Sequence, residues 1–154
     1  MASHDGVLTE ELVLQRARSA AHVGEVRRLT CVGMGLRDVS VCARLTQLTH
    51  ISLVGNAITT LAPFAPCAYL AELFLRRNEV SDYAELDWLR DLRHLSTLWL
   101  LDNPLAAAAD YRQRVAMALP QLSMLDVTAI QQSERSRRDD APETLPETDA
   151  VGLA

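Results

Sequence analysis

Short apolar segments with the spacing of a strand recur along this chain, several of them followed by an asparagine. The clearest segment is "LAELFLRRNEV", Leu70–Val80, in which Leu73 and Leu75 are two residues apart. Residues at that spacing point to one side of a strand, and the residues between them point to the other side. Phe74 therefore lies where a half-buried strand normally carries a polar side chain. The segment predicts a short strand with an aromatic ring on its open face.

The segment is one copy of a repeat that keeps the asparagine in phase. Three copies read L-x-x-L-x-L-x-x-N-x-L, with Ile accepted at the fourth position and Ile or Val at the last: 48–58, 70–80 and 95–105. A weaker copy at 26–36 has Cys31 and Met34 at two of the fixed positions, and a truncated copy follows with Leu122, Leu125 and Val127. The starts at 26, 48, 70 and 95 give periods of 22, 22 and 25 residues. This is the leucine-rich repeat signature.

The repeat predicts an α/β solenoid, because one repeat buries its apolar side only by stacking on its neighbours. We expect a short leucine-rich repeat horseshoe of about five repeats. Its asparagine ladder, Asn56, Asn78 and Asn103, should satisfy backbone groups inside the turns. The three extra residues of the third repeat leave room for a helix on the convex side, which the apolar spacing places at Tyr83, Leu86, Leu89 and Leu92. Asp82 and Glu85 form a capping-box pattern at its start.

Both ends of the array carry segments that predict covering helices, as solenoids need at their exposed ends. Within 8–21, Thr9 is the expected N-cap of a helix whose apolar stripe is Leu12, Val13, Ala17, Ala20 and Ala21. At the other end, one helix face should hold Tyr111, Val115 and Leu119, and a further short helix is expected from Thr128. The predicted organisation is a flexible N-terminus (1–7), a capped leucine-rich repeat domain (8–130), and a short helical extension with a disordered acidic tail or linker (131–154).

The variable positions of the strands should line a concave face. Read across the repeats they give four columns: Arg28, His50, Glu72 and Thr97; Thr30, Ser52, Phe74 and Trp99; Val32, Val54, Arg76 and Leu101; Gly33, Gly55, Arg77 and Asp102. Adjacent strands lie about 4.8 Å apart, so Phe74 and Trp99 should be side by side. The predicted partner-binding residues are Arg28, His50, Ser52, Val54, Glu72, Phe74, Arg76, Arg77, Trp99 and Leu101.

The aromatic pair has two interpretations. Exposed apolar patches rimmed by charge mark interaction sites, which favours a protein partner. The alternative is that a terminal segment of the chain covers the rings, or that they only pack on each other. Arg76 and Arg77 are open to two interpretations as well: a guanidinium pair that holds an acidic or phosphorylated ligand, or ion pairs within the fold. For Arg77 we favour a pair with Asp102; for Arg76 a pair with a neighbouring acid such as Glu72 stays open.

Charge and composition narrow the function classes. The net charge is −5, of which −3 lies in residues 131–154, so the body carries only −2 and has no general attraction for a phosphate backbone. No run of eighteen apolar residues and no secretory signal are found, which predicts a cytosolic or nuclear protein that does not bind membranes. The three cysteines, Cys31, Cys42 and Cys67, lack metal-ligand spacing and fit core thiols. We find no catalytic, metal-binding or cofactor-binding residues and expect no enzyme.

Several motifs together resemble the family of cilia- and flagella-associated protein 410. They are "LFLRRN" (73–78), "LWLLDNP" (98–104), the segment Tyr111–Asp126, and the openings at 8–17 and 26–33. The resemblance implies a scaffold of the cytoplasm and cytoskeleton at the basal body of the cilium or flagellum, with a NIMA-related kinase or basal-body proteins as partners. It also implies oligomerisation through a C-terminal helix. No heptad pattern follows Thr128, so this chain is expected to be monomeric without that helix. Gln131 and Gln132 depart from the glutamates of the family.

Two other functions stay open. Similar repeats occur in regulatory subunits of protein phosphatases or kinases, although such arrays are often longer. The segment Tyr111–Asp126 also resembles short leucine-rich repeat proteins of ribonucleoproteins, including a spliceosomal one. A ribonucleoprotein component should carry a basic stripe, which the charge count does not favour.

Overall fold

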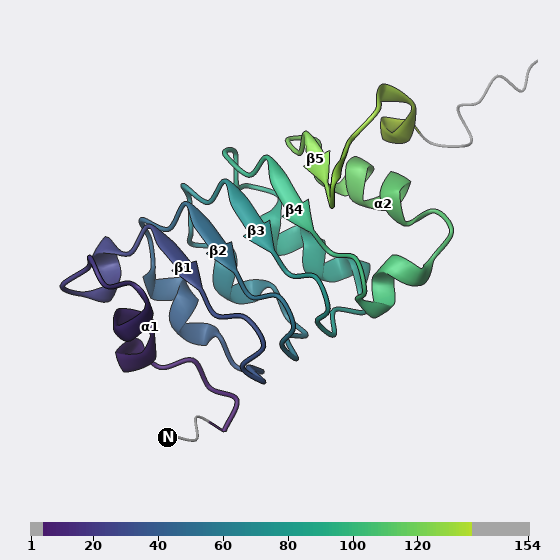
Figure 1. Cartoon of the computed structure of the whole chain (residues 1–154). Coiled ribbons are helices and arrows are strands. Elements are labelled where there is room, and N and C mark those ends of the chain that lie inside the picture. Colours follow the sequence, from purple (N-terminus) through teal and green to yellow (C-terminus); the bar gives the residue numbers. More distant parts are fainter. Residues whose placement is uncertain (1–4, 137–154) are drawn as a thin grey trace, which may run out of the picture.

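Short parallel strands form one face of the structure, and short helices form the opposite face (Figure 1). This is a computed structural model, which describes residues 5–136. The strands follow chain order across one sheet: β1 (Arg28–Thr30), β2 (His50–Ser52), β3 (Glu72–Phe74), β4 (Thr97–Trp99), β5 (Met124–Leu125) and β6 (Thr128–Ala129). The first five are parallel, and β6 pairs with β5 in the antiparallel sense.

The register of the strands is the one that the repeat predicts. Phe74 lies opposite Ser52 on one side and Trp99 on the other, and Glu72 lies opposite His50 and Thr97. Each of the first four strands buries only its central residue, in order Leu29, Ile51, Leu73 and Leu98. The variable positions within the strands therefore lie on the concave face, as expected.

The convex side is built mainly from 3₁₀-helices: η2 (Ser40–Arg44), η3 (Ala62–Phe64), η4 (Tyr83–Leu89) and η5 (Pro104–Ala107). The predicted helix is η4, and its 3₁₀ form fits the spacing of three in its apolar residues, because a 3₁₀-helix has three residues per turn. The capping box is wrong. Asp82 accepts from the Ala84 amide, but the Glu85 carboxylate instead accepts from Thr60 Oγ1 at 2.7 Å and from the Leu61 amide at 2.8 Å. Glu85 thus ties η4 to the preceding coil.

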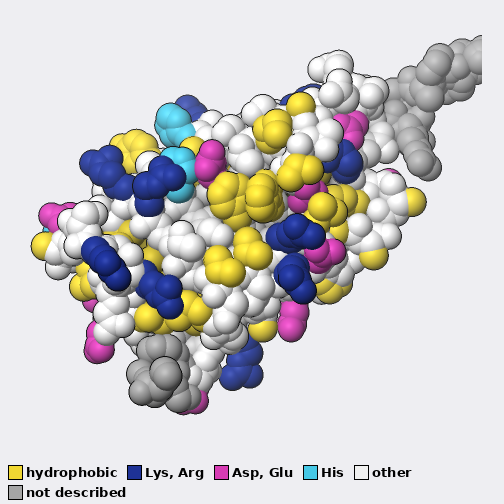
Figure 2. Space-filling model, viewed as in Figure 1, with side chains coloured by type: hydrophobic (Ala, Val, Ile, Leu, Met, Phe, Trp, Pro, Cys, Tyr) yellow, Lys and Arg dark blue, Asp and Glu magenta, His cyan; other side chains and the backbone are white. Residues whose placement is uncertain are grey.

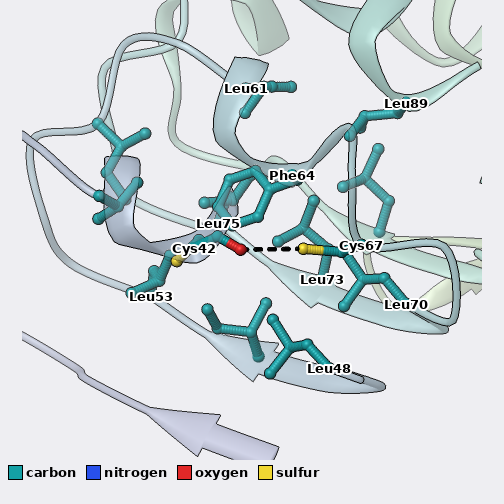
Figure 3. Close-up of a cluster of buried hydrophobic side chains, with 14 of the residues drawn as sticks. Cys42, Leu48, Leu53, Leu61, Phe64, Cys67, Leu70, Leu73, Leu75 and Leu89 are labelled. Carbon is teal, nitrogen blue, oxygen red and sulfur yellow. Dashed lines mark hydrogen bonds between the residues drawn. The ribbon is translucent and has the colours of Figure 1, made fainter. Parts of the chain in front are cut away.

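Leucines from neighbouring coils surround Phe64 in the core between the two faces (Figure 3). The three cysteines are buried, as expected, and Cys67 Sγ donates to the Cys42 carbonyl at 3.3 Å. Burial raises the pKa of the Cys42 thiol well above its ordinary value and raises the pKa of Cys67 to about 11. Both thiols therefore stay protonated and pack as small apolar groups.

Inside the turns, the asparagine ladder makes the bonds that were predicted. Each amide nitrogen donates to the carbonyls of two coils: Asn56 to Cys31 and Leu53, Asn78 to Leu53 and Leu75, Asn103 to Leu75 and Leu100. Each amide oxygen accepts from a backbone amide of the preceding coil. The ladder therefore fixes the spacing between consecutive coils.

The N-terminal helix, α1 (Glu10–Arg16), begins where the sequence indicates, with Thr9 Oγ1 accepting from the Leu12 amide at 3.2 Å. It ends earlier than the predicted apolar stripe. Ala20 and Ala21 lie outside it, and Ala21 is exposed, because the chain leaves the helix at Ala17 to turn toward β1 through η1 (Val23–Glu25). Residues before position 8 also make contacts: the Gly6 carbonyl accepts from the amides of Arg37 and Asp38.

At the C-terminal end, α2 (Tyr111–Ala118) buries Tyr111 and Val115, with Leu119 just beyond it, as predicted. Two expectations are wrong here. Val127 is 73% exposed, because it lies in the tight turn between β5 and β6, and Thr128 begins a strand. The short helix is η6 (Gln132–Arg135), which starts four residues later and packs on α2. The limits at 8 and 130 stay predictions, and the predicted tail beyond residue 136 lies outside the described residues.

Arg112 holds this end together. Its guanidinium donates to Glu134 Oε2 at 2.6 Å and to the carbonyls of Leu125, Thr128 and Ala129. The hydrogen bond from Arg112 lowers the pKa of Glu134 below its ordinary value. A carboxyl whose pKa is lower in the folded state stabilises the fold above its unfolded pKa, about 4.3 for glutamate, and loses that contribution as the pH falls.

We therefore expect Glu134→Gln to be less stable than the parent chain at pH 6 and to match it more closely at pH 3. Urea denaturation followed by circular dichroism at both pH values measures the difference. A gap between the two chains that stays the same from pH 6 to pH 3 would contradict the assignment of this pH dependence to the Arg112–Glu134 pair.

Candidate functional site: the concave face

The centre of the concave face is an aromatic pair on β3 and β4. The ring centroids of Phe74 and Trp99 lie 4.6 Å apart, with an angle of 50° between the ring planes. Both side chains are half-buried, so the rings pack on each other and still present part of their surface. Figure 2 shows hydrophobic side chains gathered over the middle strands of this face. The expected juxtaposition of the two rings is confirmed.

Further apolar side chains extend the patch along the third column. Val54 is half-buried, Leu101 is 39% exposed and Val32 is 51% exposed. Aromatic and aliphatic surface of this kind loses water readily when another molecule covers it. The third column thus adds apolar surface just beyond β1, β2 and β4, and Arg76 interrupts it beyond β3.

A row of polar side chains borders the patch along the first column. Arg28 Nη1 lies 3.1 Å from His50 Nδ1, and His50 Nε2 lies 3.4 Å from Glu72 Oε1. The shorter side chains of Thr30 and Ser52 leave a hollow of about 80 Å³ between this row and the Phe74 ring. The row places one positive and one negative charge on the same side of the face, linked through an imidazole.

The arginines of the third and fourth columns do not pair as expected. Arg76 Nε donates to Asp102 Oδ2 at 2.9 Å, and Glu72 contacts His50. The predicted Arg77–Asp102 pair is therefore wrong. Arg76 does pair with a neighbouring acid, which was the interpretation left open for it, but that acid is Asp102 and not Glu72. The reason is the backbone: φ is +63° at both Arg77 and Asp102, so the fourth column lies in a turn where the alternation of a strand no longer holds.

Arg77 is left without a carboxylate. Within residues 5–136 its guanidinium makes no hydrogen bond or ion pair, and the side chain is exposed. A free guanidinium beside an apolar patch is a ready donor for a carboxylate or phosphate group. The face as a whole carries Arg28, Arg76 and Arg77 against Glu72 and Asp102, a formal charge of +1 on a body that is negative overall.

None of the ten predicted contact residues is buried in the core. Arg28, Arg76, Arg77 and Leu101 are exposed; His50, Ser52, Val54, Glu72, Phe74 and Trp99 are half-buried. Their role in binding stays a prediction.

The sequence interpretation missed two exposed aromatic residues elsewhere. Tyr69, 52% exposed, stacks on His94 with centroids 6.0 Å apart, at the rim where the strands begin. Both residues directly precede the first leucine of a repeat, so the aligned repeats already indicated that their rings lie side by side. Trp88, 48% exposed, lies on η4 on the convex side. Neither ring belongs to the four columns of the strands, so the two provide matched controls for the Phe74–Trp99 pair.

Residues 5–136 hold no group of three or more His, Cys, Asp or Glu side chains placed to bind a metal ion. In the same residues no helix is long and apolar enough to cross a membrane.

Comparisons with known proteins agree with the repeat and with the resemblance in sequence. The family pattern described as "Leucine-rich repeat" matches residues 36–149. Cilia- and flagella-associated protein 410 of Mus musculus is 41% identical over 84% of this chain and 53% of its own length; that of Homo sapiens is 39% identical over 94% and 58%. The chain thus spans a little over half the length of these relatives. The resemblance to this protein is confirmed.

Among solved structures, a chain of the Drosophila melanogaster SNF/U2A′ complex matches 83% of this chain and 87% of its own length, with a TM-score of 0.57 and 24% identity. At that identity the match supports the fold alone.

Proposed function

This chain belongs to the leucine-rich repeat family, and we propose that it is a non-enzymatic interaction domain that binds a protein partner on its concave face. The observation that carries the proposal is the Phe74–Trp99 pair, a partly exposed aromatic cluster at the centre of the face. Aromatic residues and arginine dominate the binding energy of protein interfaces when they lie at the centre of the contact. The apolar surface of the third column and the arginines around the pair fit that arrangement.

The relatives support a more specific version of the proposal. Their name associates them with cilia and flagella, and we propose that this chain serves in a scaffold at the basal body, within the cytoplasm and cytoskeleton. A NIMA-related kinase or a basal-body protein is the proposed partner. We propose that oligomerisation depends on a C-terminal helix and that the leucine-rich repeat domain by itself is monomeric.

We also propose that the fold contains five coils closed at both ends. α1 contacts β1, and α2 contacts η4, η5 and η6. Arg112 occupies the carbonyls of the last strands, which supports a closing role for the C-terminal segment. If both ends are covered in this way, the concave face is left open for a partner.

The proposal predicts that Phe74→Ala/Trp99→Ala abolishes partner capture while the melting temperature changes little. Part of the surface of each ring packs on the other ring, and the rest faces the open side. The double substitution should therefore reduce mainly the free energy of binding. Affinity capture from ciliated cells, read by mass spectrometry, tests this, with the melting temperature measured by circular dichroism. The matched control is Tyr69→Ala/Trp88→Ala, which removes two exposed rings away from the concave face and should keep the partner.

The identity of the captured proteins separates the alternatives. Basal-body proteins or a NIMA-related kinase support the ciliary scaffold; phosphatase subunits or other kinases support a regulatory subunit. Splicing factors would support a ribonucleoprotein component. A large loss of stability in the Phe74/Trp99 variant would show that the rings belong to the core and would overturn the proposal.

A further inference from the structure

We infer that the partner segment bound by the concave face is acidic: it places a large apolar side chain on the Phe74–Trp99 pair and a carboxylate on Arg77. This inference rests on the proposed function and adds the chemistry of the partner. It follows from which charges of the face are already neutralised within the fold and which one is not.

Most charges on the face have an internal partner. Asp102 holds Arg76 at 2.9 Å, and the imidazole of His50 lies between Arg28 and Glu72 at 3.1 and 3.4 Å. A partner chain that displaced these contacts would lose about as much as it gained, since exposed charge pairs contribute little to stability. They therefore border the site and do not select a charged ligand.

Arg77 is the exception. Its guanidinium is exposed and unpaired within residues 5–136, and it follows Phe74 by three positions on the same coil. At Arg77 φ is +63°, a conformation that a non-glycine residue adopts at a cost. Backbone preference therefore does not explain why an arginine stands at this position. A carboxylate within about four residues of an apolar anchor could reach Arg77 while the anchor covers the rings. A guanidinium forms two parallel hydrogen bonds with such a group.

The same charges disfavour a nucleic acid. Single-stranded RNA also stacks on aromatic rings, but it needs a positive groove that follows its phosphates. Here Glu72 and Asp102 stand on either side of the rings, and the face carries a formal charge of only +1. A single unpaired guanidinium suits a single acidic side chain better than a run of phosphates.

A peptide selection tests the inference with the full chain. A phage-displayed library of random peptides is selected on the parent chain, on Arg77→Glu, and on Arg93→Glu. Arg93 is exposed in the turn between η4 and β4, so this control makes the same change in net charge away from the face. The parent chain and the Arg93 variant should enrich a large apolar residue with Asp or Glu within four positions. The Arg77→Glu variant should enrich Lys or Arg there instead.

The affinity of the best parent-selected peptide, measured by fluorescence anisotropy, should fall about 10- to 100-fold on Arg77→Glu, because a charge-assisted hydrogen bond is replaced by repulsion. Changing the acidic residue of the peptide to Lys should restore binding to that variant. Arg77→Asn, which suits the left-handed backbone, should show a smaller loss. Circular dichroism confirms that each variant is folded.

Each other outcome is decisive. Peptides that lose binding to Phe74→Ala/Trp99→Ala but bind Arg77→Glu as well as the parent chain would overturn this inference and leave the proposed function standing. Peptides that are indifferent to both sets of variants would overturn both. A selection that yields no peptide, or a labelled single-stranded RNA that binds and is lost with the aromatic pair, would also overturn the acidic-peptide inference.

Discussion

Asp126→Ala is expected to lower the free energy of unfolding by about 3 kcal/mol, because three donors that lie near it would lose their acceptor. Asp126 is 5% exposed. Its Oδ1 accepts from the amides of Leu100 and Leu101 at 2.8 and 2.9 Å, and its Oδ2 accepts from Tyr111 Oη at 2.8 Å. The carboxylate thereby joins β4 and the chain after it to α2. Urea denaturation followed by circular dichroism measures the loss.

The control is Asp126→Asn, which keeps the oxygen that accepts the two amides. Tyr111 Oη can accept from the new amide nitrogen, so we expect a loss of only about 1 kcal/mol. Equal losses for the two variants would show that the charge, and not the acceptor geometry, stabilises this end of the fold.

The contact between Asp126 and the Tyr111 phenol should also affect the pH dependence of stability at high pH. Burial, followed by the nearby Asp126 carboxylate, raises the pKa of Tyr111 above its ordinary value. The unfolded chain ionises near pH 10 while the folded chain does not, so the stability of the parent chain should fall as the pH rises beyond about 10. Tyr111→Phe should remove part of that slope, which urea denaturation between pH 8 and 11 would measure.

Asp126 shows where sequence reasoning was incomplete. The truncated last repeat suggested that Leu122, Leu125 and Val127 would point inward, and Leu122 and Leu125 do. The backbone turns at Asp126, where φ is +59°, and this directs the carboxylate inward and leaves Val127 in solvent. No spacing rule anticipates that change, because the alternation of a strand assumes an extended backbone at every position.

The strands and the ladder were predictable for a physical reason. A repeat that stacks on identical copies must keep one register, since a slip of one residue would turn every buried leucine into solvent. The alignment of the asparagines therefore fixed which residues face each other from β1 to β4, including Phe74 and Trp99. The pairing of Arg76 with Asp102 was not predictable in this way, because the fourth column leaves the strand at residues with positive φ.

Asn78→Ala is the second large effect, and we expect a loss of about 3 kcal/mol. The amide of Asn78 is 5% exposed; it donates to the Leu53 and Leu75 carbonyls at 2.9 and 3.0 Å and accepts from the Ile58 amide at 3.0 Å. Alanine would leave the Ile58 amide without its acceptor, and it would remove one of the two asparagine donors from each of the Leu53 and Leu75 carbonyls. The loss should appear as a lower urea midpoint with a similar slope, since the fold and its buried area remain.

Asn78→Asp distinguishes this site from Asp126, although the two side chains have nearly the same shape. Asp126 is surrounded by donors, whereas the nitrogen of Asn78 faces carbonyl oxygens, which would repel an ionised carboxylate. Burial and this repulsion should raise the pKa of the new carboxyl in the folded state. Its protonated form donates to one carbonyl, so the variant should be weakest at neutral pH and regain stability as the pH falls toward 4. If Asn78→Asp were as stable as the parent chain at pH 7, the amide would not be acting as a donor between the coils.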